Sequence, residues 1–407
     1  MGETPMRLMA KMAMLRSCTV VLQTGGTTHG GCERGRIPAL ELVGNMKGNA
    51  MAAVKPEALE FKPDLEEAAR RWEAYYAGQI IDRPLACVTS YWPDRKGGPG
   101  STYHDRVYGD MDQCIDKAIL NGWATYHAGD TIPGACFSFG PDEIAVFCGA
   151  ELVFSDDSPD TNWSRPFVDD WNDALPLRLH EDHPLWQRML EFYRRAALKT
   201  KGKMLLGHID LHTNMDILAP IRNPERLCMD LIDTPEMIDR AMADARAIFP
   251  KVWYPIVQAG RMEERNFPLS MHNLQCDFCC MVSPAMFRRW ILPALEEEAV
   301  IVKHAYYHWD GPGALKHIDA ICQSKGLHTL GYVPTCSPAT ENRVMHIRCL
   351  DLLKECQRRG KAVQFCGTPE ECKAAHKELD PRKVMYTTHT ETPKQADELL
   401  EWFVRNT

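Results

Sequence analysis

The sequence predicts an α/β protein built as a (β/α)8 barrel of the TIM type. In its second half, short apolar segments alternate with helical segments at regular spacing, which is typical of a parallel sheet. No glycine-rich nucleotide-binding motif opens any of the helical segments, and polar residues follow the ends of several different strands. An open, doubly wound sheet would also fit the alternation. The other two observations favour the barrel, whose active sites lie at the carboxyl ends of the strands.

Periodicity, turn residues and caps place the individual elements. An early helix is expected just after Asp64, which can cap it. The strands are expected at residues 85–89, 203–211, 268–278, 302–309, 327–333, 362–366 and 383–388. The later helices are expected at residues 235–249, 284–301, 313–325, 344–359 and 369–377.

The predicted organisation has two parts. Residues 1–60 show no sustained helical or strand period and contain glycine pairs, so we expect a poorly ordered N-terminal extension. Arg7, Lys11 and Arg16, with no acidic residue between positions 4 and 32, would also suit a targeting segment. The folded barrel domain is expected to occupy residues 61–407.

Composition narrows the class of protein. The chain has 407 residues, of which 45% are apolar and 25% charged, so it can bury a large core. Its net charge of −8 and its lack of a basic stripe argue against a nucleic-acid partner. The 16 cysteines are scattered through apolar segments, as expected for reduced thiols in a cytoplasmic protein. The longest apolar stretch, residues 8–22, is interrupted by Lys11 and Arg16, so no membrane span is expected.

The most informative stretch contains Tyr307, His308 and Asp310 and ends in a sharp Gly-Pro-Gly turn. His308 and Asp310 are two residues apart at the end of a predicted strand, so they project to the same side. Together they can share a proton, a substrate group or a metal ion. The alternative interpretation is that Asp310 caps the next helix while His308 is a hydrogen-bonded core residue.

A second polar cluster surrounds Asp210 and His212. If the strand continues to residue 212, its period of two places His208, Asp210 and His212 on one face. This grouping would suit a metal ion by residue type, and it would equally suit a polar barrel mouth that holds a substrate. We predict substrate contact by Asp210 and His212.

Asp277 marks the end of another predicted strand, ahead of a helix that Ser283 caps. Cys276 and Cys279 have C-x-x-C spacing, but no second pair completes a structural zinc site. Asp277 is therefore the stronger functional candidate. Two further strands end at residues 332–336 and 387–391, so His389 and Cys336 are expected to reach the same mouth. Tyr332 and Trp92 are aromatic candidates for contact with a substrate there.

The order of these motifs resembles the uroporphyrinogen decarboxylase superfamily, which includes corrinoid-dependent methyltransferases. The resemblance covers about residues 60–405. It is carried by Arg83-Pro84 before the first strand, by Asp277 with Ser283-Pro284 and Phe287 ahead of Leu292-Pro293, and by the strand, turn and helix from His308 to Ile318. It implies a (β/α)8 barrel with a deep mouth, and therefore an enzyme.

The chain departs from two patterns within that superfamily. The uroporphyrinogen decarboxylases carry an arginine-rich R-Q-A-G-R-Y loop, whereas the corresponding residues 90–96 here read S-Y-W-P-D-R-K. The zinc methyltransferases use H-x-C on one strand and a distant cysteine. Here His308 matches, Asp310 stands in place of the cysteine, and His389 or Thr390 falls near the third position.

The resemblance therefore implies zinc held by His308, Asp310 and His389. It also implies two partners, a small-molecule substrate and a corrinoid carried by a corrinoid protein. Imidazole and carboxylate ligands suit oxygen-linked chemistry better than thiol methylation. The main functional hypothesis is methyl transfer from a small methylated substrate to or from a corrinoid. The predicted catalytic residues are His308, Asp310 and Asp277. The predicted substrate-binding residues are Asp210, His212, Arg83, Trp92, Tyr307 and Tyr332.

Three alternatives stay open. A metal-free decarboxylase, or lyase, would use Asp277 or Asp310 to stabilise a cation or move a proton on a carboxylated ring such as a porphyrinogen. A sugar-processing hydrolase would use paired acids such as Asp210, Asp277 and Asp310, with tryptophans as stacking platforms. A binding barrel without catalysis is the third.

Overall fold

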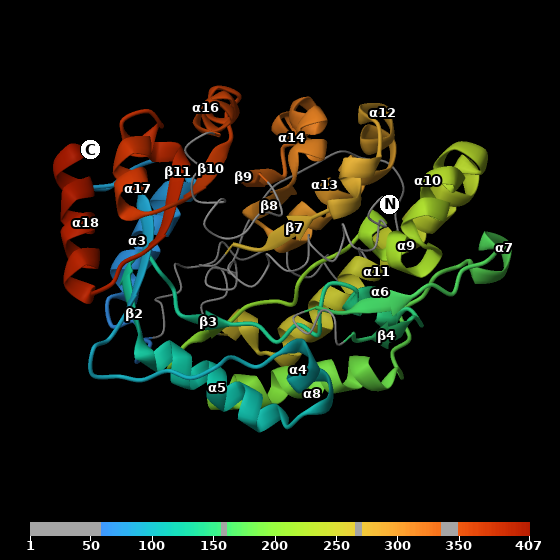
Figure 1. Cartoon of the computed structure of the whole chain (residues 1–407), viewed down its shortest axis with the longest axis horizontal. Helices are drawn as coiled ribbons and strands as arrows, with labels where there is room; N and C mark the ends of the chain where they lie inside the picture. The colour runs from blue at the N-terminus through green and yellow to red at the C-terminus, as the bar shows by residue number, and fades with distance from the viewer. Residues whose placement is uncertain (1–57, 156–160, 265–270, 335–348) are drawn as a thin grey trace, which may run out of the picture.

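The computed structural model describes residues 58–155, 161–264, 271–334 and 349–407. Nearly all of the predicted N-terminal extension, with its targeting alternative, lies outside these residues, as does most of the loop after β9, including Cys336. The described residues form an α/β structure in which helices surround a mostly parallel sheet, as Figure 1 shows. The α/β class predicted from the sequence is thus confirmed.

Within the described residues, the central sheet has seven strands in the order β2-β1-β11-β10-β9-β8-β7. Every neighbouring pair is parallel except β1 and β2, which are antiparallel. Most side chains of β1, β8, β9, β10 and β11 are buried, because parallel strands are covered on both faces. The strands are β1 (Leu85–Tyr91), β2 (Thr125–Gly129), β7 (Asn273–Gln275), β8 (Ala305–Asp310), β9 (Leu327–Val333), β10 (Ala362–Cys366) and β11 (Val384–His389).

Two shorter pairings extend this arrangement beyond β7. Strands β3 (Gly134–Ala135) and β6 (Leu205–Leu206) pair in parallel, and a parallel bridge between His212 and Gln275 joins the segment after β6 to β7. Among the described residues, no pairing joins β3 to β1 or β2. The closed (β/α)8 barrel is therefore not confirmed. The remaining pair, β4 (Glu151–Val153) with β5 (Trp163–Arg165), is antiparallel and separate.

One face of the sheet encloses a compact apolar cluster. Leu85 of β1, Met385 of β11 and Leu205 of β6 belong to it, so strands that are far apart in the sheet order meet at one cluster. Helix α3 (Leu65–Tyr76) contributes Trp72 to the same cluster. The sheet is therefore strongly curved, and α3 packs against its concave side.

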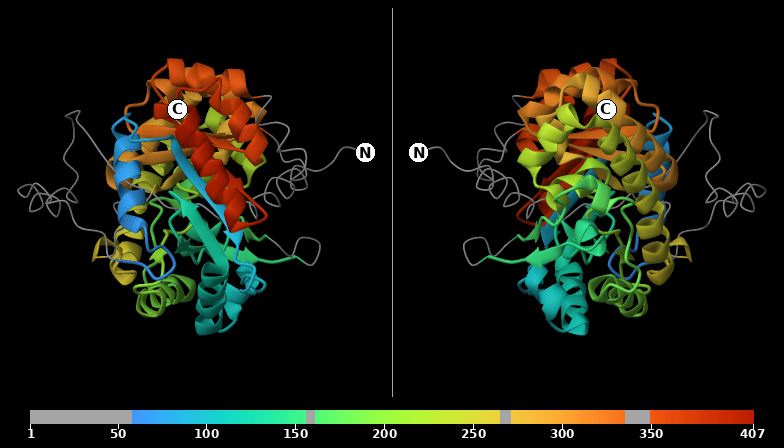
Figure 2. Two further views of the ribbon diagram at one scale, coloured as in Figure 1. Left: turned by 90° about the vertical axis from the view of Figure 1, so that its left-hand side faces the viewer. Right: turned by 90° about the vertical axis from the view of Figure 1, so that its right-hand side faces the viewer.

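The larger apolar core lies between the sheet and the surrounding helices. Figure 1 shows α14, α16 and α17 outside strands β8 to β11, and α5 and α8 on the opposite side of the molecule. In Figure 2, the C-terminal helix α18 lies along β1 and β2, which it contacts. The helices thus pack around the outside of the sheet. Polar residues lie at the carboxyl ends of its strands.

The helix bounds follow the expected caps at several places. Thr368 and Thr392 form capping boxes at the starts of α17 and α18, and each helix has proline as its first residue. Besides α3, the α-helices of the described residues are α4 (Tyr103–Tyr108), α5 (Met111–Ala124), α6 (Glu143–Phe147), α7 (Trp171–Ala174), α8 (Pro184–Lys199), α9 (Met215–Arg222), α10 (Pro224–Asp233), α11 (Pro235–Ala259), α12 (Pro284–Met286), α13 (Leu292–Val302), α14 (Ile318–Gln323), α16 (Leu350–Arg358), α17 (Pro369–His376) and α18 (Pro393–Asn406). Among the described residues, none of these helices has both the length and the apolar character that crossing a bilayer requires.

Candidate functional site

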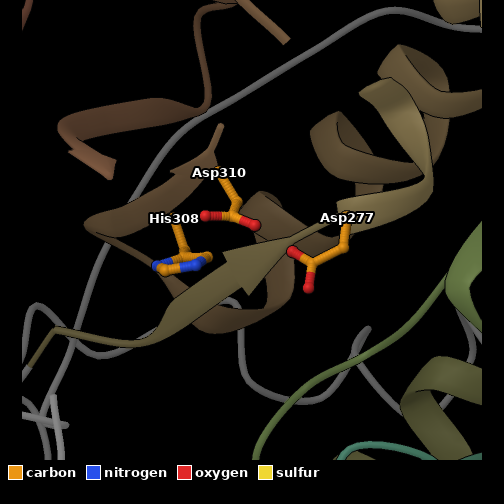
Figure 3. A group of neighbouring side chains, drawn as sticks. All are labelled: Asp277, His308 and Asp310. Carbon is orange, nitrogen blue, oxygen red and sulfur yellow. The ribbon is translucent and has the colours of Figure 1, made fainter. Parts of the chain in front are cut away.

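Three predicted catalytic residues meet at the carboxyl ends of β7 and β8. Asp277, His308 and Asp310 each offer one ligand atom, and these atoms lie within 4.8 Å of one another. Figure 3 shows the carboxylates of Asp277 and Asp310 facing each other, with the His308 ring beside Asp310. The group contains one imidazole and two carboxylates, which are suitable ligands for a divalent cation.

Strand β8 places two of these side chains on the same face. Side chains alternate along a strand, so His308 and Asp310 point to one side and Tyr307 and Trp309 to the other. The strand ends at Gly311, whose φ of 74° turns the chain sharply and lies in the region that glycine adopts without strain. Gly311, rather than Asp310, is the N-cap of the following 3₁₀ segment, so Asp310 does not act as a helix cap.

Asp277 is held by a buried neighbour on another element. It begins the 3₁₀ segment η6 (Asp277–Met281), which starts two residues after β7 ends. The Asp216 carboxylate, in the first turn of α9, accepts hydrogen bonds from the backbone N–H of Asp277 at 2.8 Å and of Phe278 at 2.9 Å. Asp216 therefore fixes the turn that presents Asp277 to His308 and Asp310.

The predicted substrate residues Asp210 and His212 lie one strand away from His308. The Gln275 amide nitrogen donates a hydrogen bond to Asp210 at 2.5 Å, and Gln275 is the register partner of His308 on β8. The His212 ring lies between two carboxylates, 3.4 Å from Asp210 and 3.3 Å from Asp216. The structure thus brings both residues next to the site, through Gln275 on one side and Asp216 on the other.

Two further buried acids lie near this network. Burial raises the pKa of Glu298, on α13, to about 8. Burial also raises the pKa of Glu143 to about 8, although the Ser138 hydroxyl and the Phe139 N–H donate to its carboxylate. Both carboxyl groups are therefore mainly protonated at neutral pH, which limits the negative charge that surrounds the site.

The neighbouring cysteines do not assemble a thiolate site. Cys276 and Cys279 are buried, and burial raises the pKa of both thiols well above its usual value. The Cys276 thiol donates to Asp216 at 3.6 Å, whereas Cys279 contacts the Tyr307 hydroxyl at 3.9 Å. Burial raises the pKa of Cys280 to about 11. The two cysteines of the C-x-x-C pair thus contact different side chains, Asp216 and Tyr307.

His389 does not join the three-residue group, although the sequence predicted it as a metal ligand. It lies at the carboxyl end of β11, where its Nδ1 atom is 3.1 Å from the Thr89 hydroxyl and its ring contacts Tyr91. Asp277 occupies the third place in the group instead. Spacing along the sequence pointed to the last strand, whereas the 3₁₀ turn after β7 brings a carboxylate closer.

The structure places Arg83 away from the site. It precedes the amino end of β1, while Asp277, His308 and Asp310 lie at the carboxyl ends of strands parallel to it. Its guanidinium makes a buried, bidentate ion pair with Asp130, at 2.5 and 3.1 Å. The geometry therefore gives Arg83 a structural partner rather than a substrate.

The aromatic candidates are distributed over two faces. Tyr307 is fully buried on the face of β8 opposite to His308, and Tyr332 contacts Trp309 edge to face on that same side. Neither ring therefore shares the His308 face. Trp92 follows the carboxyl end of β1, where it packs against Tyr126 and under the Arg95 guanidinium.

Sequence reasoning missed the two residues that connect the site, Asp216 and Gln275. Asp216 lies four residues after His212, but the non-helical turn at Asn214 separates the two, so neither helical nor strand spacing pairs them in the sequence. Gln275 is the last residue of β7, and a strand of only three residues is too short for its alternation to be recognised in the sequence.

Comparison with known proteins adds a likeness in fold. The chain matches no family model and no curated protein. Among solved structures it is similar to a methyltransferase from Methanosarcina mazei, with a TM-score of 0.54 and 12% identity, over 83% of this chain and 98% of that one. At this identity the likeness shows a methyltransferase-type fold and leaves the uroporphyrinogen decarboxylase resemblance unconfirmed.

Proposed function

We propose that this protein is a methyltransferase that moves a methyl group between a small methylated substrate and a corrinoid. The observation that carries the proposal is the group formed by Asp277, His308 and Asp310 at the carboxyl ends of β7 and β8. Polar groups at this end of a parallel sheet are where α/β enzymes place their chemistry. The fold likeness to a methyltransferase supports the reaction class at a coarse level.

A divalent cation such as zinc fits the donor set. Imidazole nitrogen and carboxylate oxygen bind zinc at about 2.0–2.2 Å, so two ligands of one ion lie at most about 4.4 Å apart. The three atoms here lie within 4.8 Å of one another, so small side-chain rotations bring them into range. With one imidazole and two carboxylates, the set is harder than the thiolate-rich sets that bind sulfur substrates.

The residues of this chain suggest how the reaction is supported. A bound cation would supply Lewis acidity toward the heteroatom that carries the methyl group. His308, Asp310 and Asp277 would hold that cation, and the nearby Asp210 carboxylate offers an acceptor for a substrate hydrogen-bond donor. In such a transfer the methyl group would leave the heteroatom without the bonding electron pair, and the heteroatom would take up one proton. A bound corrinoid would supply the electron pair of the new bond to the methyl group.

Metal analysis and a corrinoid assay test this proposal together. Purified protein is expected to contain one zinc or similar ion per chain, and to methylate free cob(I)alamin from one member of a donor panel. The panel would contain an alcohol, an aryl methyl ether, a methylated amine and a methyl thioether, and the loss of cob(I)alamin absorbance is the measurement. Asp310→Asn should lose both metal and activity, whereas Asp351→Asn, at a position 98% exposed, should keep both.

The alternatives give different results in the same experiment. A metal-free decarboxylase would release CO2 from a carboxylated ring after chelator treatment, and a sugar hydrolase would release free sugar from glycosides. Protein that binds no metal and transfers no methyl group from any donor would contradict the proposal.

A further inference from the structure

Asp216 links the turn that carries Asp277 to the helix that follows the Asp210–His212 segment. Its side chain is 7% exposed, and its two oxygens accept the N–H groups of Asp277 and Phe278. A carboxylate that accepts two successive backbone N–H groups fixes the direction of that peptide segment. Since Asp277 is the first residue of this segment, its Cα–Cβ bond is fixed as well.

A second contact holds Asp216 itself in place. His212 Nδ1 lies 3.3 Å from Asp216, and its other ring nitrogen lies 3.4 Å from Asp210. All three residues are buried, with exposed fractions between 6% and 9%. The result is a continuous row of polar groups from Asp210 through His212 and Asp216 to the backbone of Asp277.

The backbone between His212 and Asp216 adopts an unusual conformation, which brings these two side chains together. Asn214 has φ 50° and ψ −123°, a conformation that L residues other than glycine rarely adopt. Two hydrogen bonds offset the strain of this conformation. The Asn214 side-chain nitrogen donates to the Gln275 carbonyl, and the Asn214 side-chain oxygen accepts the Met215 N–H. The chain therefore turns within three residues, so that the end of one strand and the first turn of α9 face each other.

We propose that Asp216 is the positioning residue of the site: it holds Asp277 at the distance from His308 and Asp310 that a divalent cation requires. The inference rests on the proposed cation site and adds to it a residue that binds neither the cation nor the substrate. Partners of this kind orient metal ligands in many proteins, and their loss typically weakens metal binding about 10–100-fold.

Cobalt titration of the full-length protein tests the role. Co²⁺ is the probe, because its visible absorption reports both binding and ligand geometry. Asp216→Asn has nearly the same shape but only one acceptor oxygen, so one of the two backbone N–H groups loses its partner. We expect Co²⁺ affinity to fall about 10–100-fold in Asp216→Asn and at least as far in Asp216→Ala. At saturating Co²⁺, the spectrum of Asp216→Asn should also differ from that of the wild type.

Asp244→Asn is the matched control. Asp244 accepts a backbone N–H from Leu177 at 2.9 Å, but it lies in α11, away from the site. This variant should bind Co²⁺ like the wild type and give the same spectrum. A general effect of losing a carboxylate that accepts a backbone N–H would appear in both variants, whereas a positioning effect appears only at position 216.

The outcomes separate the inference from the function on which it rests. If the wild type binds Co²⁺ and folded Asp216→Asn binds it equally tightly with an unchanged spectrum, the positioning role is wrong and the cation site stands. If the wild type binds no Co²⁺ and contains no metal, the cation site itself fails, and the positioning role fails with it. Thermal unfolding of the metal-free variants identifies protein that is not folded, and the spectrum at saturation reports only on the folded fraction.

Discussion

His308 and Tyr307 are adjacent in the sequence, but their side chains lie on opposite faces of β8. His308 shares its face with Asp310 and belongs to the three-residue group, while the Tyr307 hydroxyl contacts the Cys279 thiol at 3.9 Å. Burial raises the pKa of Tyr307 well above its usual value, so the hydroxyl stays protonated. Adjacent residues of one predicted motif therefore have different roles, one in the site and one in the core.

This separation predicts different phenotypes for the two residues. Tyr307→Phe removes one weak hydroxyl–thiol contact and should lower the free energy of unfolding by about 1 kcal/mol or less, with metal content unchanged. His308→Ala removes a proposed ligand and should abolish metal binding while leaving the fold intact. Metal analysis and urea unfolding of both variants provide the measurement. Loss of metal from Tyr307→Phe would place its ring at the site after all.

The second half of the fold could be predicted because its strands are buried on both faces and are bounded by clear turn residues. Strands β9 and β10 have the predicted bounds, whereas β8 begins three residues later and β11 one residue later than predicted, and both end one residue later. Helix α11 runs to Ala259, ten residues past the predicted end, since Pro250 and Pro255 lie within it. The first half was largely missed, because β2 and β3 are short and their burial does not alternate.

The site was predicted in part for a similar reason. His308 and Asp310 were found because alternation within one strand is a local property that sequence records. Asp216 acts through backbone N–H groups some sixty positions away in the chain, a contact that depends on how α9 and η6 pack. His389 is not part of the three-residue group, because the order of strands does not reveal which strand ends lie nearest to one another.

The buried ion pair between Arg83 and Asp130 predicts a stability defect rather than a binding defect. Asp130 is fully buried, and it also accepts the Ala86 N–H at 2.8 Å. Arg83→Met removes the bidentate partner and leaves only the more distant Arg71 guanidinium, 3.8 Å from Asp130, so it should lower the free energy of unfolding by about 3 kcal/mol. Combining it with Asp130→Asn should restore part of the loss, because the uncompensated charge is removed. Urea unfolding measures both variants, and an unchanged stability with a raised KM would instead support substrate binding by Arg83.

Three buried histidines predict a loss of stability in mild acid. Burial lowers the pKa of His208 to about 3 and the pKa of His328 and His127 to about 4. In the unfolded chain these rings take up protons near pH 6.5, whereas the folded protein keeps them neutral. Their contribution to stability is therefore fully present above pH 6.5. It is lost as the pH falls from there toward 4, by at most about 1.4 kcal/mol per pH unit for each histidine.

The measurement is urea unfolding at several pH values between 8 and 5. His328→Phe keeps a ring against Tyr75 and Tyr76 but cannot be protonated, so its stability should fall less steeply with acid than that of the wild type. His104→Gln, at an exposed position, is the control and should leave the slope unchanged. Equal slopes in His328→Phe and the wild type would show that His328 is not responsible.

The close packing of the Tyr306 ring against Gly331 predicts that substitutions at these two positions have coupled effects on stability. Gly331 is the register partner of His308, and the Tyr306 ring passes over it to donate a hydrogen bond to Gln364 of β10 at 2.7 Å. A Cβ atom at position 331 would lie 1.6 Å from the Tyr306 hydroxyl oxygen and 2.1 Å from the ring carbon that bears it. Gly331→Ala must therefore displace the ring and break that hydrogen bond.

We expect Gly331→Ala to lower the free energy of unfolding by about 2–4 kcal/mol, from overpacking and the lost hydrogen bond together. In a Tyr306→Ala background the same substitution has nothing to displace, so its additional cost should be small. A Tyr306→Phe background should not relieve it, because the ring carbons at 2.1 and 2.6 Å remain in the way. A double-mutant cycle in urea measures the coupling. If Gly331→Ala costs the same in all three backgrounds, its effect comes from the backbone of β9 rather than from Tyr306.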